Sequence, residues 1–225
     1  MKRNNVIGIT AAAAVIVLSV VLISRYLDKR TPLLIQGTVE CTTYKASSKV
    51  PGRIDEMKVE EGDRVEKGQL LYMLSTPELE AKLRQAEGAV SEVESYIGDA
   101  MVYSPVTGEV STVIAEEGEL VGSGYPVVAI LDMSDMWVTF NVKETLLPGM
   151  KLGTRMTGFV PALDRDVEFE VTYIAPQADF ATWAATRTQG GFDIRTFAVK
   201  ARPVSVAENM RPGMSVLVDW DKIGR

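Results

Sequence analysis

The chain states one sequence pattern twice, and this repeat constrains the fold more than any other feature. Residues 59–71 read VEEGDRVEKGQLL, and residues 115–127 read AEEGELVGSGYPV. Two short units are too few for a solenoid, which needs several stacked repeats. The repeat therefore predicts one module with two-fold pseudo-symmetry, in which neither half buries its apolar face alone. An ungapped offset of 56 residues aligns Gly52 with Gly108, Gly62 with Gly118, and Gly68 with Gly124.

Each half alternates apolar runs with glycine-containing turns, which is typical of β structure. Apolar residues at Ile54, Met57 and Val59 precede an EEGD turn, and LLYML at 70–74 has the pattern of a buried strand. Because glycine adopts positive φ without steric cost, we predict turns at the six aligned glycines. Gly62 and Gly118 should have positive φ in equivalent turns. Phosphate binding by these glycines would need a strand–loop–helix context, which the sequence lacks.

Residues 76–100, between the two halves, change to a helical period. Thr76 followed by Pro77 is a favourable helix start. Apolar residues then recur at spacings of four and three, the pattern of a coiled-coil seam. The residues of this predicted hairpin seam are Leu79, Leu83, Ala86, Val90, Val93 and Ile97.

This helical segment conflicts with the two-fold module. A single helix of about 22 residues would be roughly 33 Å long. If the halves share one sandwich, Ser75 and Met101 should lie within about 10–15 Å of each other, a few strand spacings. We predict a short antiparallel hairpin that turns near Gly88. The alternative is the base of a longer hairpin whose middle is missing from the chain.

The N-terminus predicts a membrane anchor. After a tail of residues 1–5, residues 6–24 read VIGITAAAAVIVLSVVLIS without any charge. As a helix they would span about 28 Å, close to the thickness of a hydrocarbon core. Bulky and basic residues follow, which favours an uncleaved anchor over a signal peptide. Anchor residues include Val6, Ile9, Val15, Leu18, Val21 and Ile23.

The flanking charges leave the orientation of this anchor open, because basic residues stand on both sides of it. We expect the short tail inside and the remainder of the chain outside. Cys41 has no lipoprotein-type sequence before it and reads as an ordinary strand residue.

Residues 135–221 have the pattern of a second β module. Five or six short strand-like runs in about 85 residues, separated by Pro and Gly turns, indicate a small barrel or sandwich. Residues 178–193 form a longer predicted loop, and we expect its Trp183 to plug the barrel end. PGM occurs twice before a strand, which predicts barrel turns at Pro148, Gly149 and Met150 and at Pro212, Gly213 and Met214.

Composition excludes several kinds of chemistry. The chain has no histidine, so Ser-His-Asp and Cys-His catalysis and histidine-containing metal sites are excluded. Its single cysteine permits no intrachain disulfide. The net charge of −6 and the scattered Lys and Arg argue against nucleic-acid binding. We predict no catalytic residue, no metal site and no cofactor.

An ordered series of segments resembles the HlyD-like membrane fusion proteins, the periplasmic adaptor subunits of bacterial export machines. The segments are KVPGRIDEMKVEEGDRVEKGQLLYML, a helix opening with PELEAKLRQAE, and MVYSPVTGEVSTVIAEEGELVGSGYPVVAIL. Later runs such as MWVTFNVKETLLPGMKLG and ENMRPGMSVLVDW resemble the barrel of that family. The resemblance extends from residue 33 to residue 221.

The resemblance implies a mainly β fold. An N-terminal transmembrane helix would precede a lipoyl-like domain, a barrel-sandwich hybrid made of residues 31–75 and 101–134. A truncated α-helical hairpin at 76–100 would interrupt this domain, and a β-barrel at 135–221 would follow it. The six aligned glycines would be the lipoyl-like turns.

The resemblance also implies a function. The chain would be a non-enzymatic adaptor in the bacterial inner membrane, with its bulk in the periplasm, that forms a homo-oligomeric ring around a transporter. The chain ends after the barrel at Arg225, which looks more like adaptors of ABC-type transporters than those of proton-driven pumps. Family members with a full hairpin contact an outer-membrane channel. The short hairpin makes this contact doubtful for this chain.

Two other functions compete with the adaptor. A membrane-anchored biotinyl or lipoyl carrier domain shares the half-motif, but it needs a modified Lys at the tight turn between the halves. Lys58, in the sequence EMK, lies inside the first half and aligns with Ile114. A membrane-anchored hydrolase would need a nucleophile motif such as GxSxG, which the sequence lacks.

Overall fold

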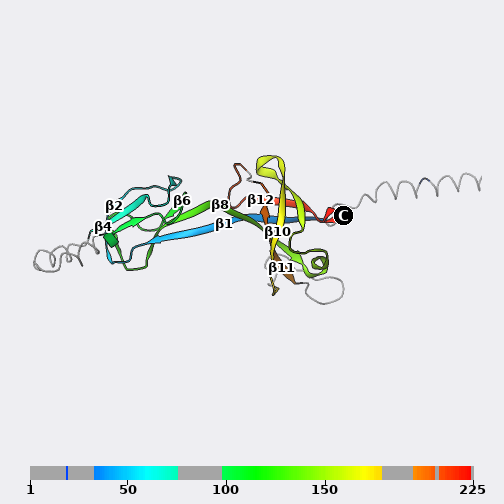
Figure 1. Cartoon of the computed structure of the whole chain (residues 1–225), viewed down its shortest axis with the longest axis horizontal. Helices are drawn as coiled ribbons and strands as arrows, with labels where there is room; N and C mark the ends of the chain where they lie inside the picture. The colour runs from blue at the N-terminus through cyan, green and yellow to red at the C-terminus, as the bar shows by residue number, and fades with distance from the viewer. Residues whose placement is uncertain (1–18, 20–32, 76–97, 179–194, 206–207, 224–225) are drawn as a thin grey trace, which may run out of the picture.

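The computed structural model describes residues 19, 33–75, 98–178, 195–205 and 208–223. They form two β modules arranged along an elongated molecule (Figure 1). The strands are β1 (Leu34–Ser47), β2 (Gly52–Met57), β3 (Arg64–Val65), β4 (Leu70–Ser75), β5 (Met101–Tyr103), β6 (Gly108–Val113), β7 (Leu120–Val121), β8 (Pro126–Lys143), β9 (Arg155–Val160), β10 (Arg165–Ile174), β11 (Thr196–Pro203) and β12 (Ser215–Asp219). Three short 3₁₀ helices are η1 (Glu144–Gly149), η2 (Pro161–Leu163) and η3 (Trp220–Lys222).

Two long strands run through both modules and join them (Figure 1). β1 has 14 residues and β8 has 18, and they pair antiparallel from Gly37↔Phe140 to Ser47↔Pro126. β8 crosses the predicted boundary between the two modules, at residues 134 and 135, as one strand with a bulge. Cys41 pairs with Met136 and Thr42 with Asp132, which leaves residues 133–135 of β8 unpaired with β1. The two modules meet at this bulge.

The C-terminal module is a closed barrel. Its strands follow the order β1-β12-β9-β10-β11-β8, and the pairing of β1 with β8 closes the ring. Closure leaves no unpaired strand edge, which protects such a small module from edge-to-edge association. Fully buried Phe140 and Phe169 fill the interior together with valines of every strand. The strand runs predicted within 135–221 are confirmed as β9, β10, β11 and β12.

The N-terminal module is a sandwich whose two halves obey the 56-residue offset in their hydrogen bonds. The Gly62 amide donates to the Val110 carbonyl at 2.8 Å, and the Gly118 amide donates to the Ile54 carbonyl at 2.8 Å. Strand registers repeat in the same way: Ile54 pairs with Leu74 in one half, and Val110 with Ile130 in the other. Both of these strand pairs carry a bulge at the equivalent position. The predicted pseudo-symmetry is confirmed.

The two halves share a single core, as predicted. β5, at the start of the second half, pairs antiparallel with β4, at the end of the first, and Met101 lies opposite Met73. Ser75 is only two residues, about 7 Å, farther along β4. The chain therefore leaves and re-enters the sandwich at the same end. One cluster of buried residues from both halves fills the interior, including Leu71, Tyr72, Val127 and Ile130.

Two of the six predicted turn glycines are not turn residues. Gly52 begins β2 and Gly108 begins β6, and neither has positive φ. Gly108 is needed for close approach instead: a Cβ atom there would lie 2.2 Å from the Leu131 carbonyl oxygen of β8. The other four are confirmed as turn residues, with φ of 92° at Gly62, 85° at Gly68, 86° at Gly118 and 76° at Gly124.

One of the two predicted barrel turns is also wrong. Pro148 and Gly149 end the 3₁₀ helix η1, and Met150 is buried against the barrel core. The turn before β9 comes later, at Gly153, whose φ is 80°. Proline at the preceding position favours a helical turn as readily as a β-turn, which the PGM sequence alone does not distinguish. The turn at Pro212, Gly213 and Met214 is confirmed, with φ of 89° at Gly213.

Several predictions fall outside the described residues. They are the anchor at 6–24 apart from Ser19, the seam from Leu79 to Ile97, and the plug formed by Trp183. Within the described ranges, no helix has the length and apolar character needed to cross a membrane.

Candidate functional site

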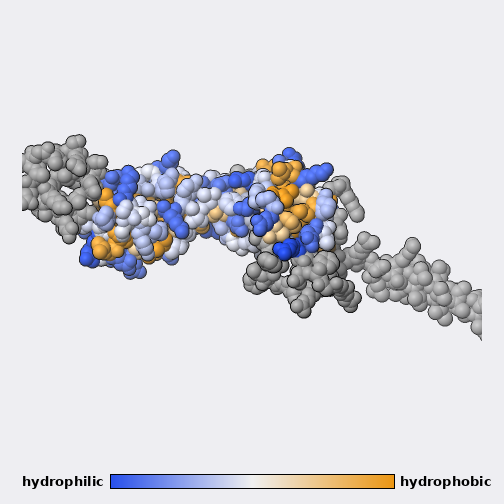
Figure 2. All heavy atoms as spheres, turned by 90° about the horizontal axis from the view of Figure 1, so that it is seen from below, coloured by the Kyte–Doolittle hydropathy of each residue, from blue (hydrophilic) through white to orange (hydrophobic). Residues whose placement is uncertain are grey.

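Polar side chains from distant parts of the sequence gather at two places, the waist between the modules and the outer end of the sandwich. On the face seen in Figure 2, hydrophobic side chains gather over the barrel and the far end of the sandwich, and the waist is more hydrophilic. Within the described residues, no group of three acidic or cysteine side chains has the arrangement of a metal site.

Asp135 holds the bulge of β8 in place at the waist. Its carboxylate accepts a hydrogen bond from the Thr42 hydroxyl at 2.5 Å and forms an ion pair with Arg202 at 2.6 Å. The Thr42 hydrogen bond and the Arg202 guanidinium hold the pKa of Asp135 below its ordinary value. One side chain thus ties together β1, β8 and β11 where the sandwich meets the barrel.

A second polar group lies on the barrel side of the waist. The Trp137 indole N–H donates to Glu40 at 2.9 Å, which joins β8 to β1. The Lys200 ammonium lies 4.7 Å from the centre of the Trp137 ring and 6.0 Å from that of Tyr173. Such cation–π contacts stabilise a lysine on a partly exposed sheet face.

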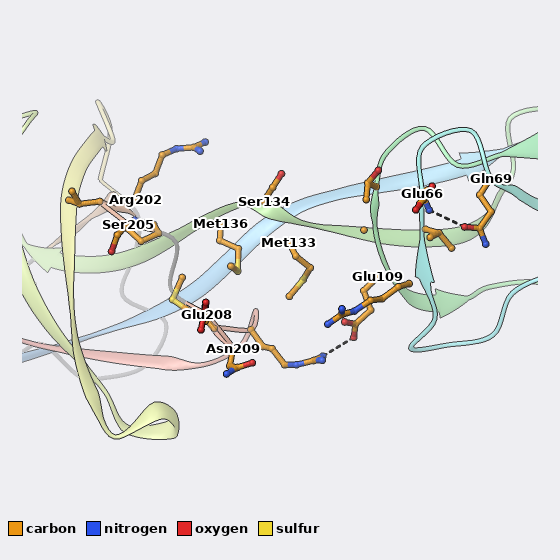
Figure 3. Close-up of a pocket in the computed structure, with 18 residues that line it drawn as sticks. Glu66, Gln69, Glu109, Met133, Ser134, Met136, Arg202, Ser205, Glu208 and Asn209 are labelled. Carbon is orange, nitrogen blue, oxygen red and sulfur yellow. Dashed lines mark hydrogen bonds and ion pairs between the residues drawn. The ribbon is translucent and has the colours of Figure 1, made fainter.

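A cleft of about 940 Å³ opens between the modules at the waist (Figure 3). Met133 and Met136 of β8 and the buried Met210 contribute apolar lining. Arg211 of the barrel forms an ion pair with Glu109 of the sandwich at 2.7 Å, and the Glu109 side chain is only 16% exposed. Besides β1 and β8, this ion pair is a direct link between the modules.

Cys41 lies in the same region and behaves as a structural residue. Partial burial is the main cause that raises the pKa of the Cys41 thiol, and the negative charges of Asp132 and Asp135 raise it further. A thiol that stays protonated is a weak nucleophile and a weak metal ligand. This agrees with the prediction that Cys41 is an ordinary strand residue.

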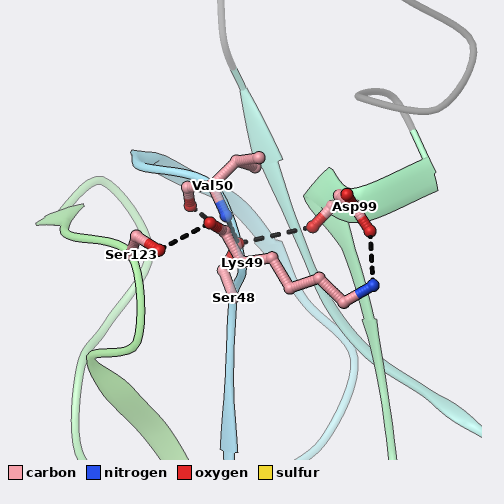
Figure 4. Close-up of polar contacts among 5 residues, drawn as sticks. All are labelled: Ser48, Lys49, Val50, Asp99 and Ser123. Carbon is pink, nitrogen blue, oxygen red and sulfur yellow. Dashed lines mark hydrogen bonds and ion pairs between the residues drawn. The ribbon is translucent and has the colours of Figure 1, made fainter. Parts of the chain in front are cut away.

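The other polar group lies where the chain re-enters the sandwich (Figure 4). The Lys49 ammonium pairs with Asp99 at 2.8 Å, and the Ser123 hydroxyl donates to the Lys49 carbonyl at 2.6 Å. The buried Ser48 hydroxyl donates to the Val50 carbonyl at 2.7 Å. These contacts tie residues 98–100, which are helical, to the loop after β1 and to a turn of the second half.

The turn glycines serve the fold rather than a ligand. In each of the four sandwich turns, the glycine amide donates at 2.8 Å to a main-chain carbonyl of the other half. An amide that is already used in this way is not available to cradle a phosphate. The carbonyls are those of Val110 for Gly62, Ser104 for Gly68, Ile54 for Gly118 and Ser48 for Gly124.

Lys58 does not occupy the position of a carrier lysine. It follows β2, its amide donates to the Leu71 carbonyl at 2.8 Å, and its ammonium pairs with Glu56. The connection between the two halves, where a carrier would place its lysine, leaves the module after Ser75 instead.

Sequence reasoning missed the contacts of the waist. The Asp135–Arg202 pair joins residues 67 positions apart, and the Glu109–Arg211 pair joins residues 102 positions apart. Neither pair has a motif or a periodic spacing that would single it out among the 30 acidic residues.

Comparison with known proteins gives matches to both modules. A sequence profile described as "RND MFP, barrel-sandwich hybrid domain" matches residues 43–133, which end at the bulge of β8. The 36 kDa antigen of Helicobacter pylori strain J99 is 30% identical over an alignment of 322 positions, which covers 97% of this chain and 97% of that protein.

Solved structures share the fold. A MacA–MexA chimeric protein, which contains the α-hairpin domain of Pseudomonas aeruginosa MexA, has a TM-score of 0.64 and 17% identity, with 83% of this chain and 81% of that chain covered. The membrane fusion protein Spr0693 of Streptococcus pneumoniae R6 has a TM-score of 0.60 and 17% identity, with 83% and 97% covered. At these identities the likeness concerns the fold alone.

Proposed function

The chain belongs to the membrane fusion protein family of periplasmic adaptors, and we propose that it serves as the adaptor subunit of a bacterial export system. In this role it is a non-enzymatic protein of the inner membrane that assembles as a homo-oligomeric ring around a transporter. The transporter supplies the energy for export, and the adaptor holds the components of the system in position. Function in such a protein resides in contact surfaces and in the angle between its modules.

One observation carries this proposal. The sandwich is interrupted between β4 and β5, and both ends of the interruption lie side by side at the end of the molecule opposite the barrel. A carrier domain closes this position with a tight turn. An adaptor uses it to project a helical hairpin away from the membrane.

Only residues 76–100 connect β4 to β5, and we infer that this connection is shortened internally. The alignment with the Helicobacter pylori antigen has 322 positions, whereas this chain has 225 residues, so at least 97 positions of the relative have no counterpart here. Because the alignment covers 97% of both proteins, these positions lie almost wholly inside it. The connection between β4 and β5 is the natural place for them, since both β modules have all the strands they need to close.

The missing length is large on the scale of an adaptor. Two helical legs of about 48 residues each would reach roughly 70 Å farther. We therefore propose that this chain, as it stands, contacts its inner-membrane transporter but does not reach an outer-membrane channel. Insertion of a full-length hairpin between Ser75 and Met101 should restore that contact, which cross-linking to the channel would detect.

The class of transporter has two candidates. An ABC-type partner is the candidate that the sequence resemblance favours. The profile that matches residues 43–133 is described for RND-type adaptors, which favours a proton-driven partner. Purification of the cross-linked complex distinguishes the two candidates, since ATPase activity that vanadate inhibits belongs to the first alone.

The experiment that tests the adaptor function uses the full chain in the bacterium that encodes it. Deletion should increase sensitivity to exported compounds, and in-membrane cross-linking of a tagged chain should capture a polytopic transporter and further copies of the chain. The anchor is tested in the same cells: the full chain should resist an alkaline carbonate wash, and a variant without residues 1–30 should not. Protease added to spheroplasts should digest the β modules if the bulk of the chain lies in the periplasm.

The runner-up function, a biotinyl or lipoyl carrier, has a simple test. The intact mass should equal the sequence mass, with or without the initiator Met. A mass increment of biotin or lipoate on any Lys, Lys58 first, would replace the adaptor proposal with the carrier.

A further inference from the structure

A patch of apolar side chains lies at the end of the barrel where β1 begins. Leu33 is 41% exposed, Leu34 is 54% exposed, and Phe159 is 38% exposed. Leu217 and Trp220 are half-buried beside them. These five residues, the barrel-end patch, come from β1 and the residue before it, β9, β12 and η3.

Main-chain pairing makes the patch continuous. Leu34 pairs with Asp219, and Gln36 pairs with Leu217, so Leu34 and Leu217 are diagonal neighbours on the outer face. Leu217 pairs in turn with Phe159 of β9. The Trp220 amide donates to the Leu33 carbonyl at 2.9 Å, which places the indole-bearing residue at the start of β1.

The position of this patch along the chain limits its distance from the membrane. This step rests on the proposed function, in which residues 6–24 span the inner membrane. From Ser24 to Leu33 the chain can extend at most about 30 Å. The apolar end of the barrel is therefore tethered close to a lipid surface, and the sandwich is the part of the molecule that points away.

Charge near the patch is mixed, since Asp219 pairs with Leu34 and Asp166 pairs with Phe159 across the sheet. The sequence between the anchor and the patch is more basic, with Arg25, Lys29 and Arg30 against Asp28. Lys222, two residues after Trp220, has a side chain that is 82% exposed, although its ammonium pairs with Asp219 at 3.1 Å. Basic residues beside exposed apolar and Trp side chains are typical of segments that lie in a membrane interface.

We propose that the barrel-end patch docks on the lipid surface of the membrane that holds the anchor. Leu33 and Leu34 enter the boundary between headgroups and acyl chains, Trp220 lies at the headgroup level, and Lys222 faces anionic lipid phosphates. Docking of the patch fixes the long axis of the molecule relative to the membrane.

An exposed leucine elsewhere provides the contrast. Leu120, in the turn region of the sandwich, is 76% exposed, more than any residue of the patch. It pairs with Arg53 rather than with another apolar residue. Single exposed leucines are common on soluble surfaces, so Leu120 serves as the matched control for an apolar position without a membrane contact.

The test uses the two tryptophans of known position in the full chain, reconstituted in lipid nanodiscs with about one-third anionic lipid. One variant, Trp137→Phe with Trp183→Phe, keeps Trp220. The other, Trp183→Phe with Trp220→Phe, keeps Trp137, whose strand partner Glu40 lies six residues, about 20 Å, along β1 from Leu34. Emission is compared between discs of ordinary lipid and discs whose acyl chains carry bromine near the headgroup.

We expect brominated lipid to lower Trp220 emission about two-fold, because docked interfacial side chains lie within 5–10 Å of the acyl boundary. Trp137 emission should be unchanged. In the Trp220-only chain, Leu34→Asp should abolish the quenching, and Leu120→Asp should leave it unchanged. Replacement of anionic by zwitterionic lipid should weaken the quenching, and Lys222→Glu should do the same.

Four results would overturn the proposal, and they are distinguishable. Equal and weak quenching of both tryptophans in chains that are held in the discs would mean that the anchor works and the patch does not dock. Quenching that survives Leu34→Asp would also exclude the patch. If Trp220 shifts only after the transporter is added, the patch binds protein and not lipid. Failure of the full chain to enter the discs would refute the anchor itself, and the docking with it.

Discussion

The two halves of the sandwich agree in their hydrogen bonds and differ on their outer faces. Inside, equivalent amides donate to equivalent carbonyls, and equivalent serines, Ser48 and Ser104, cap equivalent turns. Outside, Met101 and Tyr103 of the edge strand β5 stand 37% and 48% exposed, where the 56-residue offset places Lys45 and Ser47 in β1. The half that carries β5 is thus more apolar on its surface.

The comparison shows that the main-chain hydrogen bonds and buried positions of the repeat are constrained, and that its outer side chains are not. A main-chain hydrogen bond needs only a correct backbone, so any sequence that keeps the turn glycines and the buried apolar positions preserves it. Outer side chains have no partner inside the module, so they are free to differ between the halves. Four predictions test this difference between the halves, in order of decreasing size.

Gly108→Ala should be the most damaging of these substitutions. Its Cβ would lie 2.2 Å from the Leu131 carbonyl oxygen and 2.9 Å from Ile130 Cγ2, and the paired backbone of β8 has no room to retreat. We expect a loss of about 3 kcal/mol or more in the free energy of unfolding, measured by chemical denaturation of the full chain in detergent. Gly118→Ala, with no atom within 4 Å of the new Cβ, is the control. Equal losses at the two positions would contradict the close approach.

Tyr72 makes the first half sensitive to alkaline pH. Burial raises the pKa of its hydroxyl from 10.0 to about 12, although the neighbouring Ser48 backbone acts in the opposite direction. In the unfolded chain the Tyr72 hydroxyl ionises at a lower pH than in the folded chain. The free energy of unfolding is therefore at its full value below pH 10 and falls by about 2–3 kcal/mol as the pH rises towards 12. Tyr72→Phe should abolish this loss, which denaturation at a series of pH values will show.

The same variant has a control at neutral pH. Among the described residues, none forms a hydrogen bond of ordinary geometry with the Tyr72 hydroxyl, so its removal should change stability little at pH 7. The offset places Val128 at the equivalent position of the second half, which has no ionisable group. If Tyr72→Phe kept the alkaline loss of stability, another group would be responsible for it.

The turn glycines of the two halves should be equivalent. Gly62→Ala and Gly118→Ala place a Cβ in open space at positive φ, so each should lower the free energy of unfolding by about 1 kcal/mol, from backbone strain alone. The double variant should show the sum. Gly149→Ala, in η1 and without positive φ, is the matched control and should be neutral. A large difference between the first two would break the pseudo-symmetry.

The smallest effect concerns two exposed carboxylates that cross between the halves. Glu117 accepts from the Met57 amide at 2.7 Å, and Glu61 accepts from the Val113 amide at 3.1 Å. Glu117→Gln and Glu61→Gln should each lower stability by about 0.5 kcal/mol, because exposed charges are well screened. Glu117, with the shorter bond, should show the larger change. A loss of about 2 kcal/mol at either position would mean that the contact is much less exposed than its geometry indicates.

Local features of the fold were predictable because their cause is local. Positive φ at Gly62 and Gly118 follows from turn chemistry, and the strands β9 to β12 follow from alternating apolar residues. The predictions for Gly52, Gly108 and the sequence PGM at 148–150 failed where one residue type serves two purposes. Glycine permits either a turn or a close approach of two strands, and the sequence does not distinguish them.

The sequence alone determined that this protein is one pseudo-symmetric β module followed by a second β module, since repeats, periods and turn residues are written along the chain. How the modules meet depends on contacts that form only once the chain has folded. The continuous strands β1 and β8, the bulge at 133–135, and the ion pairs of Asp135 and Glu109 depend on residues far apart in sequence. Such contacts leave no periodic signal, because an ion pair requires only that two opposite charges arrive at the same place once the backbone has folded.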